Sequence, residues 1–145
     1  MSRAFEPPPG REVFELPLTI HPEDIDANGH VNNVVYVRWI QDAGTAHWRS
    51  KFTEEETRGS SWVVLRHEID YRRGLRLGDA VRARTWVGEP RGARFDRYVL
   101  IEGPDGAAVQ ARSDWAMVDA ASMRPVRIPA EVLERFLPGP APQAS

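Results

Sequence analysis

The sequence predicts an α+β fold in which one strand and one long helix precede a run of antiparallel strands. Apolar residues recur at helical spacing in one long stretch, and the stretches after it alternate apolar and polar residues between short turns. The predicted elements do not alternate as strand–helix–strand, and the chain has no glycine-rich phosphate loop. A nucleotide-binding parallel sheet is therefore not expected.

The first strand and the long helix are joined by a polar loop. The strand is expected over residues 12–20, where Pro17 indicates an edge position. The run HPEDIDANG that follows has the Pro, Asp, Asn and Gly residues of a loop. The helix is expected over residues 32–50, which contain no proline. Gly44 would weaken this helix unless a close neighbour needs the space, and a sheet wrapped tightly around the helix supplies such a neighbour.

Four more strands and a short helix complete the predicted domain. The runs GLRLGD, GEPRG and GPDG have turn composition, and they separate strands expected at 61–71, 79–88, 93–102 and 107–119. An amphipathic helix is expected over 129–137, opening with Pro129. We expect one domain over residues 11–138, with flexible tails rich in Pro and small residues at 1–10 and 139–145.

The composition excludes several classes of protein. With no cysteine among 145 residues, the chain has no thiolate nucleophile, no disulfide and no thiolate metal site. The net charge of −2 argues against nucleic acid as a partner, although 18 of the 19 basic residues are arginine. Codon bias explains that excess as well as phosphate recognition does. No stretch is apolar enough to span a membrane, and MSRAFEPPPG lacks the apolar region of a secretory signal, so we expect a cytoplasmic protein.

The densest cluster of functional side chains lies in the loop before the long helix. Unpaired N–H groups at a helix N-terminus favour negative charge and can stabilise an oxyanion, while a nearby carboxylate can activate water or attack a carbonyl. Capping and turn formation require the same residue types, so both interpretations stay open here. The cluster consists of Asp24, Asp26, Asn28, His30, Asn32 and Asn33.

The segment DIDANGHVNNVVYVRW resembles the active-site segment of the 4-hydroxybenzoyl-CoA thioesterase family, and also the DxNxHVNN segment of plant acyl-ACP thioesterases. IDYRRGLRLGD and SDWAMVDAASMRPVRIPAEV resemble later segments of that family in order and spacing, so the resemblance covers about residues 12–137. It implies a hotdog fold, in which an antiparallel sheet wraps one long central helix and a short C-terminal helix follows. It also implies hydrolysis of an acyl-CoA thioester without a cofactor, by a homodimer or homotetramer.

The resemblance also implies roles for individual residues. Asp26 matches the catalytic carboxylate, which serves as general base or nucleophile. Asn28 and His30 match the polar residues that accompany it. Backbone N–H groups around Gly29 to Val31 would form the oxyanion hole.

Candidate substrate-binding residues lie at the start of the expected helix and at the end of the strand expected at 61–71. Bidentate arginine contacts could hold the phosphates of CoA, although arginines between strands more often form a solvated face. The candidates are Asn32, Tyr36, Tyr71, Arg72 and Arg73, with Arg76 nearby. No metal site is expected, because His21, His47 and His67 are too widely spaced.

Two departures and two rival functions remain. Gly74 stands where many relatives have proline, and the single hotdog unit makes an acyl-carrier-protein substrate less expected. Another branch of the fold uses a carboxylate on the central helix, where Asp42 lies, but a solvated Asp42 is the simpler interpretation. A hotdog hydratase or dehydratase would usually show an Asp-x-x-Pro-x-His pattern, which is absent. A non-catalytic acyl-CoA binding protein is the second rival.

Overall fold

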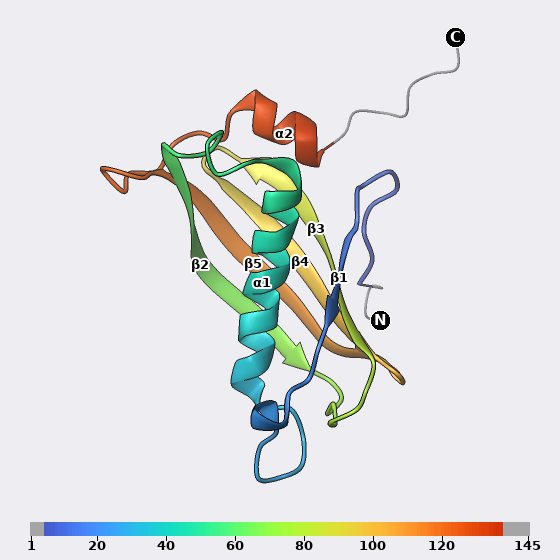
Figure 1. Cartoon of the computed structure of the whole chain (residues 1–145). Helices are drawn as coiled ribbons and strands as arrows, with labels where there is room; N and C mark the ends of the chain where they lie inside the picture. Colours follow the sequence, from blue (N-terminus) through green and yellow to red (C-terminus); the bar gives the residue numbers. More distant parts are fainter. Residues whose placement is uncertain (1–4, 138–145) are drawn as a thin grey trace.

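The computed structural model describes residues 5–137, and it confirms the predicted α+β hotdog fold (Figure 1). The predicted tails at 1–10 and 139–145 fall wholly or partly outside these residues, as does position 138. The elements are β1 (Phe14–Leu18), a 3-10 turn η1 (Pro22–Asp24), α1 (Asn33–Lys51), β2 (Ser60–Tyr71), β3 (Val81–Arg91), β4 (Arg94–Gly103), β5 (Gly106–Asp119) and α2 (Ala130–Phe136). Within the described residues, neither helix is long and apolar enough to span a membrane.

One antiparallel sheet with strand order β1-β3-β4-β5-β2 curves around α1, which runs along one face of it (Figure 1). The apolar stripe of α1 faces the sheet, so Tyr36, Trp39 and Ile40 are buried against strand residues such as Val99 and Ile101. Burying each such side chain contributes roughly 1.5–3 kcal/mol, which fixes the helix against the sheet. The sheet therefore holds the N-terminus of α1 in a defined place.

The other end of α1 belongs to a separate aromatic cluster. Trp48 and Phe52 pack with Trp115 from β5 and with Phe136 from α2. The rings of Trp48 and Phe136 are parallel, with centroids 5.6 Å apart. As a result, α2 closes the end of the molecule opposite to the polar loop, as Figure 1 shows.

Gly44 lies where α1 packs against large side chains of the sheet. A Cβ at this position would lie 3.2 Å from Arg97 Cδ and 3.3 Å from Trp115 Cζ2. The close neighbour that the sequence required is therefore a pair of large side chains from β4 and β5. The absence of a side chain at Gly44 makes room for them.

The boundary between β3 and β4 differs from the prediction. The run EPRG was expected to form a turn, but β3 continues through Glu89 and Pro90 to Arg91, and the chain reverses at Gly92, whose φ is +65°. The register between the two strands shifts between Val87 and Pro90. Such an irregularity interrupts the ladder and accommodates a proline that has no N–H to donate.

Most of the arginines on the strands pair with acids on the sheet face turned away from α1. Arg112 lies 3.0 Å from Asp96, 3.4 Å from Asp114 and 3.6 Å from Glu68. Arg82 makes a similar pair of contacts with Glu15 and Glu102. Arg112 is therefore part of a network of ion pairs around the buried carboxylates of Asp96 and Asp114.

Candidate active site

The loop before α1 is a tight, internally hydrogen-bonded reversal. Ile25 and Val31 form an antiparallel bridge, the N–H of Asp26 donates to the His30 carbonyl at 2.8 Å, and the N–H of Gly29 donates to the Asp26 carbonyl at 3.0 Å. Gly29 has a φ of +80°, which only glycine adopts at low cost. The sequence Asn-Gly thus fixes the loop that carries Asp26.

The Asp26 carboxylate has one engaged and one open oxygen. Oδ1 accepts N–H bonds from Asn28 at 2.9 Å and from His30 at 3.3 Å. Oδ2 has no hydrogen-bond partner within residues 5–137. The backbone therefore holds the carboxylate in place through one oxygen, and the other oxygen can accept a proton or attack a substrate.

Two further contacts tie the loop to the rest of the fold. The Val31 N–H donates to the Leu75 carbonyl at 2.8 Å, and the Leu75 N–H donates to the Tyr36 hydroxyl at 3.3 Å. Asp24 is buried and accepts the His21 N–H at 2.9 Å, so its role is structural. Asn32 caps α1 by accepting the Val34 N–H at 3.1 Å. The contacts of Leu75 with Val31 and Tyr36 hold the segment after β2 against the start of the helix.

These segments surround a cavity of about 440 Å³. Its walls are the loop, the first turn of α1 and the end of β2. It brings together all the predicted site residues except Gly29, which forms the turn behind it. The lining residues are Asp26, Asn28, His30, Val31, Asn32, Asn33, Tyr36, Tyr71, Arg72, Arg73 and Gly74.

The backbone geometry does not leave Gly29 to Val31 free to form an oxyanion hole, contrary to the expectation from the sequence. The N–H groups of Gly29 and Val31 donate to backbone carbonyls, and that of His30 donates to Asp26 Oδ1. The N–H of Asn33, the first residue of α1, has no acceptor among the described residues and lies at the positive end of the helix dipole. Sequence spacing could not distinguish these amides, because they are close neighbours in the chain and only the folded backbone shows which of them have acceptors.

A close contact with His30 accounts for the glycine at position 74, where many relatives have proline. A Cβ at Gly74 would lie 2.6 Å from Cδ2 of His30, a distance that no side chain tolerates. The imidazole of His30 therefore lies directly on the Gly74 backbone. A proline at this position would displace the ring. Gly74 is a site residue that the sequence flagged only as an anomaly.

The aromatic and basic walls of the cavity differ in burial. Tyr36 is buried, and burial raises the pKa of its phenol, so it stays protonated. Its ring packs edge-on against Tyr71, with centroids 5.7 Å apart. Arg72 and Arg73 are exposed at the rim, and neither has an acidic partner within the described part of the chain. Nη1 of Arg72 donates to Oε1 of Gln110 at 3.3 Å, and no carboxylate of the described residues competes with an anionic ligand for either guanidinium.

The weaker candidates lie elsewhere. Asp42 is exposed on α1, and Arg76 belongs to a turn in which its N–H donates to Asp79 Oδ2 at 2.8 Å. His47 is buried and is hydrogen bonded to Glu12 and Arg97. Between residues 5 and 137 there is no group of three or more His, Cys, Asp or Glu side chains that could hold a metal ion.

Comparisons with known proteins agree with this fold. Residues 20–136 match the family model of the thioesterase-like superfamily. The chain is 31% identical over 133 residues to the acyl-CoA thioesterase YbgC of Haemophilus influenzae, covering 85% of this chain and 93% of that protein. It is 32% identical over 79 residues to the acyl-[acyl-carrier-protein] hydrolase FATB3 of Cuphea viscosissima, covering 53% of this chain and 19% of that protein.

A solved structure shows the same fold. A thioesterase of Thermus thermophilus, crystallised with coenzyme A and Zn, superposes with a TM-score of 0.76 at 24% identity, covering 88% of this chain and 93% of that one. The fold, the family model and the similarity to an acyl-CoA thioesterase together define a thioester hydrolase of the hotdog class. The chain belongs to the thioesterase-like superfamily.

Proposed function

We propose that this protein hydrolyses acyl-CoA to a free carboxylic acid and CoA, with Asp26 as general base or nucleophile. The observation that carries the assignment of Asp26 is its open carboxylate oxygen in a cavity also lined by Asn33, whose N–H is unpaired among the described residues. If Asp26 is the general base, it accepts a proton from the water that adds to the thioester carbonyl, the C–S bond breaks, and the thiolate of CoA leaves and takes up that proton. If Asp26 is the nucleophile, it attacks the carbonyl, the C–S bond breaks to give an anhydride and the thiolate of CoA, and water then hydrolyses the anhydride to the free acid and regenerates Asp26. A thiolate is a good leaving group, so a strong general acid is not required.

The start of α1 supports the developing oxyanion. An unpaired N–H at a helix N-terminus donates to negative charge, and one such donor in a well-built site contributes about 2.7–4 kcal/mol to transition-state stabilisation. We assign this role to Asn33 in place of Gly29 to Val31. The side chains of Asn28 and His30 have no hydrogen-bond partner within the described residues, so both can orient the attacking water or the thioester carbonyl.

The rim of the cavity suits the CoA moiety. Arg72 and Arg73 are exposed and have no acidic partner between residues 5 and 137, unlike the paired arginines of the sheet. Guanidinium groups bind phosphate through two parallel N–H bonds, which makes them suitable for the phosphates of CoA. Tyr71, next to them, presents an exposed ring beside the cavity.

The assembly is a homodimer or a homotetramer built on β2. This strand is at the edge of the sheet and is 12 residues long, and its middle residue Leu65, where the register with β5 shifts, has an exposed apolar side chain. A long free edge is a template for pairing with another strand. A cytoplasmic location, expected from the sequence, stays a prediction.

The test is release of free thiol from a panel of acyl-CoAs with an aromatic, a short and a long acyl group. Asp26→Asn should lower kcat by about 100-fold or more, because it removes the general base or nucleophile. Asp42→Asn is the matched control, since it makes the same change at an exposed position of α1. Wild-type turnover by a folded Asp26→Asn variant would overturn the assignment of Asp26. Binding of acyl-CoA without any thiol release would favour a sensor.

A further inference from the structure

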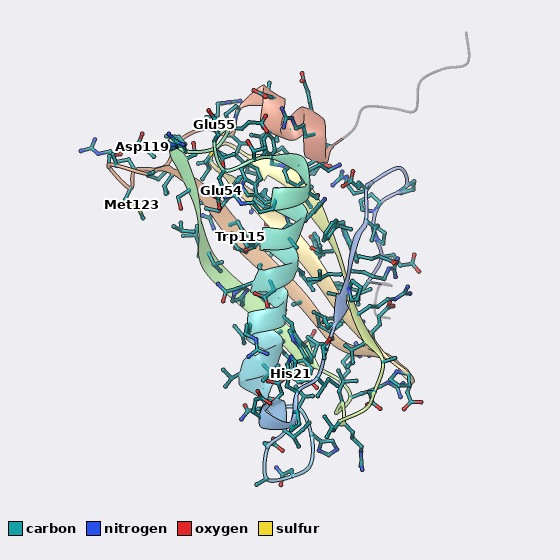
Figure 2. The ribbon with its side chains drawn as sticks, viewed as in Figure 1. His21, Glu54, Glu55, Trp115, Asp119 and Met123 are labelled. Atoms are coloured by element: carbon teal, nitrogen blue, oxygen red, sulfur yellow. The ribbon has the colours of Figure 1, made fainter. Side chains whose placement is uncertain are left out.

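A second cavity, of about 210 Å³, lies between α1, the sheet and α2. It is lined mainly by aromatic and aliphatic side chains, including Trp48, Trp62, Phe95 and Phe136. Figure 2 labels Trp115 beside the half of α1 nearest α2, and His21 near the opposite end, where the Asp26 loop lies. Asn33 and Gly44 line the two cavities and are about 16 Å apart along the helix axis. The two cavities are therefore separate in this chain.

The second cavity contains a buried cation without a counterion among the described residues. Arg97 on β4 is 3% exposed, and its Nη1 donates to Nδ1 of His47 and to Oγ1 of Thr85, both at 3.0 Å. No carboxylate within residues 5–137 lies in ion-pair distance of Arg97, and its Nε and Nη2 have no acceptor there. Burial lowers the pKa of Arg97 to about 9, so the guanidinium is still charged at neutral pH. Two donors of a buried cation thus remain unused.

A second unused donor lies in the same wall. Trp115 is almost fully buried, and its Nε1 has no hydrogen-bond partner in the described part of the chain. The side chains of Arg97 and Trp115 both lie next to Gly44, within 3.3 Å of a Cβ built there. Leaving the buried N–H of Trp115 unpaired is costly, and a carboxylate that enters the cavity would accept from it and from the free donors of Arg97.

We propose that this cavity binds an apolar monocarboxylic acid, with its carboxylate on Arg97 and the Trp115 N–H and its body among the aromatic rings. One buried guanidinium matches one negative charge, and the apolar lining disfavours a polyanion such as a phosphate ester. A cavity of about 150 Å³ is large enough for benzene, so this one accommodates a ring with a short acidic arm or a comparable aliphatic chain. Acids of this class are what a thioester hydrolase releases, but binding here does not require Asp26.

The experiment is calorimetric titration of the full chain with phenylacetate and octanoate, and with 2-phenylethanol as the neutral counterpart of phenylacetate. We expect saturable binding of the acids and at least about tenfold weaker binding of the alcohol, because charge-assisted hydrogen bonds are lost. Arg97→Met should weaken phenylacetate binding by a similar factor. Trp115→Phe, which keeps the aromatic body, should weaken it by roughly two- to tenfold.

Two controls locate the site and keep the test decisive. Arg72→Ala combined with Arg73→Ala should leave acid binding unchanged, since these residues line the other cavity. Arg97→Met should fold, because it removes a buried charge that has no counterion among the described residues, which offsets the loss of the hydrogen bonds to His47 and Thr85, and thermal unfolding checks this. If it does not fold, Trp115→Phe and the neutral alcohol still decide. Absence of saturable acid binding, equal binding of acid and alcohol, unchanged affinity in folded Arg97→Met, or loss of binding in the Arg72 and Arg73 variant would each overturn the proposal.

Discussion

The two oxygens of Asp26 have different surroundings. Oδ1 accepts backbone N–H groups of Asn28 and His30, so the loop orients the carboxylate without help from distant side chains. Oδ2 has no hydrogen-bond partner among residues 5–137, so it is available for the reaction. The same loop places His30, but the position of its ring depends on Gly74, which lies far away in the sequence. Contacts within the loop therefore orient the carboxylate of Asp26, whereas a contact with a segment distant in the sequence sets the position of the His30 imidazole.

Gly74→Ala tests whether the position of His30 matters. The new Cβ would lie 2.6 Å from the imidazole and push it aside. A displacement of about 1 Å in a catalytic group can cost up to 100-fold in rate, so we expect kcat/KM for acyl-CoA to fall roughly 10- to 100-fold. Gly74 does not have a positive φ, so the melting temperature should change little.

Gly59→Ala is the matched control for this substitution. A Cβ at Gly59 meets no atom within 4 Å, and its φ is not positive. Its activity should equal that of the wild type. If Gly74→Ala also kept full kcat/KM, the orientation of His30 would have no part in the reaction.

At the scale of elements, a buried chain of side chains ties α1 to the sheet. Arg97 on β4 donates to His47 on α1, and Nε2 of His47 lies 2.8 Å from Oε1 of Glu12, just before β1. Burial, and then the charge of Arg97, lower the pKa of His47 to about 4. Burial acts to raise the pKa of Glu12, but its hydrogen bonds to Lys51 and His47 outweigh this and lower it.

These pKa shifts predict acid lability. The folded state holds His47 neutral, whereas the unfolded chain protonates it below about pH 6.5, so stability falls as the pH drops from there toward 4. The contribution of His47 is on the order of 2–3 kcal/mol, and the lowered pKa of Glu12 adds a loss in the same direction. His47→Gln can keep both hydrogen bonds but cannot titrate.

Urea unfolding at pH 7 and pH 4.5 measures this effect. The wild type should lose more free energy of unfolding between the two pH values than His47→Gln does. An identical loss in both proteins would show that His47 does not titrate on unfolding. The far-ultraviolet circular dichroism of the variant at pH 7 checks that it is folded.

Most of the secondary structure could be predicted from the sequence, because the alternation of apolar and polar residues and the composition of turns are local signals. Every strand and both helices are where the patterns placed them, apart from the end of β3, where an irregular register accommodates Pro90. The loop of Asp26 was equally local. The contact of His30 with Gly74 and the unpaired Asn33 N–H depend on how distant segments meet, which one sequence does not reveal. The burial of Arg97 could have been predicted, because Arg97 alternates along β4 with Phe95 and Val99 and therefore lies on the same inward face of the strand.

At the scale of the whole molecule, several exposed apolar side chains lie at one edge of the sheet, the edge formed by β2. The exposed apolar side chains of Val34, Leu65 and Tyr71 lie on or near this edge strand. At the other edge, β1 has only five residues and includes Pro17, which has no N–H to offer. The two edges are therefore unequal as sites for pairing with a second copy.

Leu65→Glu tests the proposed pairing. If two copies pair antiparallel about the middle of β2, Leu65 lies opposite its own copy, and the substitution places two carboxylates face to face. Sedimentation should give the wild type a mass of at least twice that of the 16.4 kDa chain and give the variant half of the wild-type mass or less. Met123→Glu, at another exposed apolar position, should keep the wild-type mass. A monomeric wild type, or an unaffected Leu65→Glu, would contradict pairing through β2.

The inequality of the two sheet edges also limits how large an assembly can grow. When β2 pairs with its own copy about a two-fold axis, the patch is matched by itself and is used up in the pairing. The edges left at the outside are then two copies of the short strand with Pro17, which are poor templates for a further chain. If β2 pairs in this way, growth by strand addition stops after one step. This pairing would protect a concentrated solution of the protein from forming head-to-tail fibres.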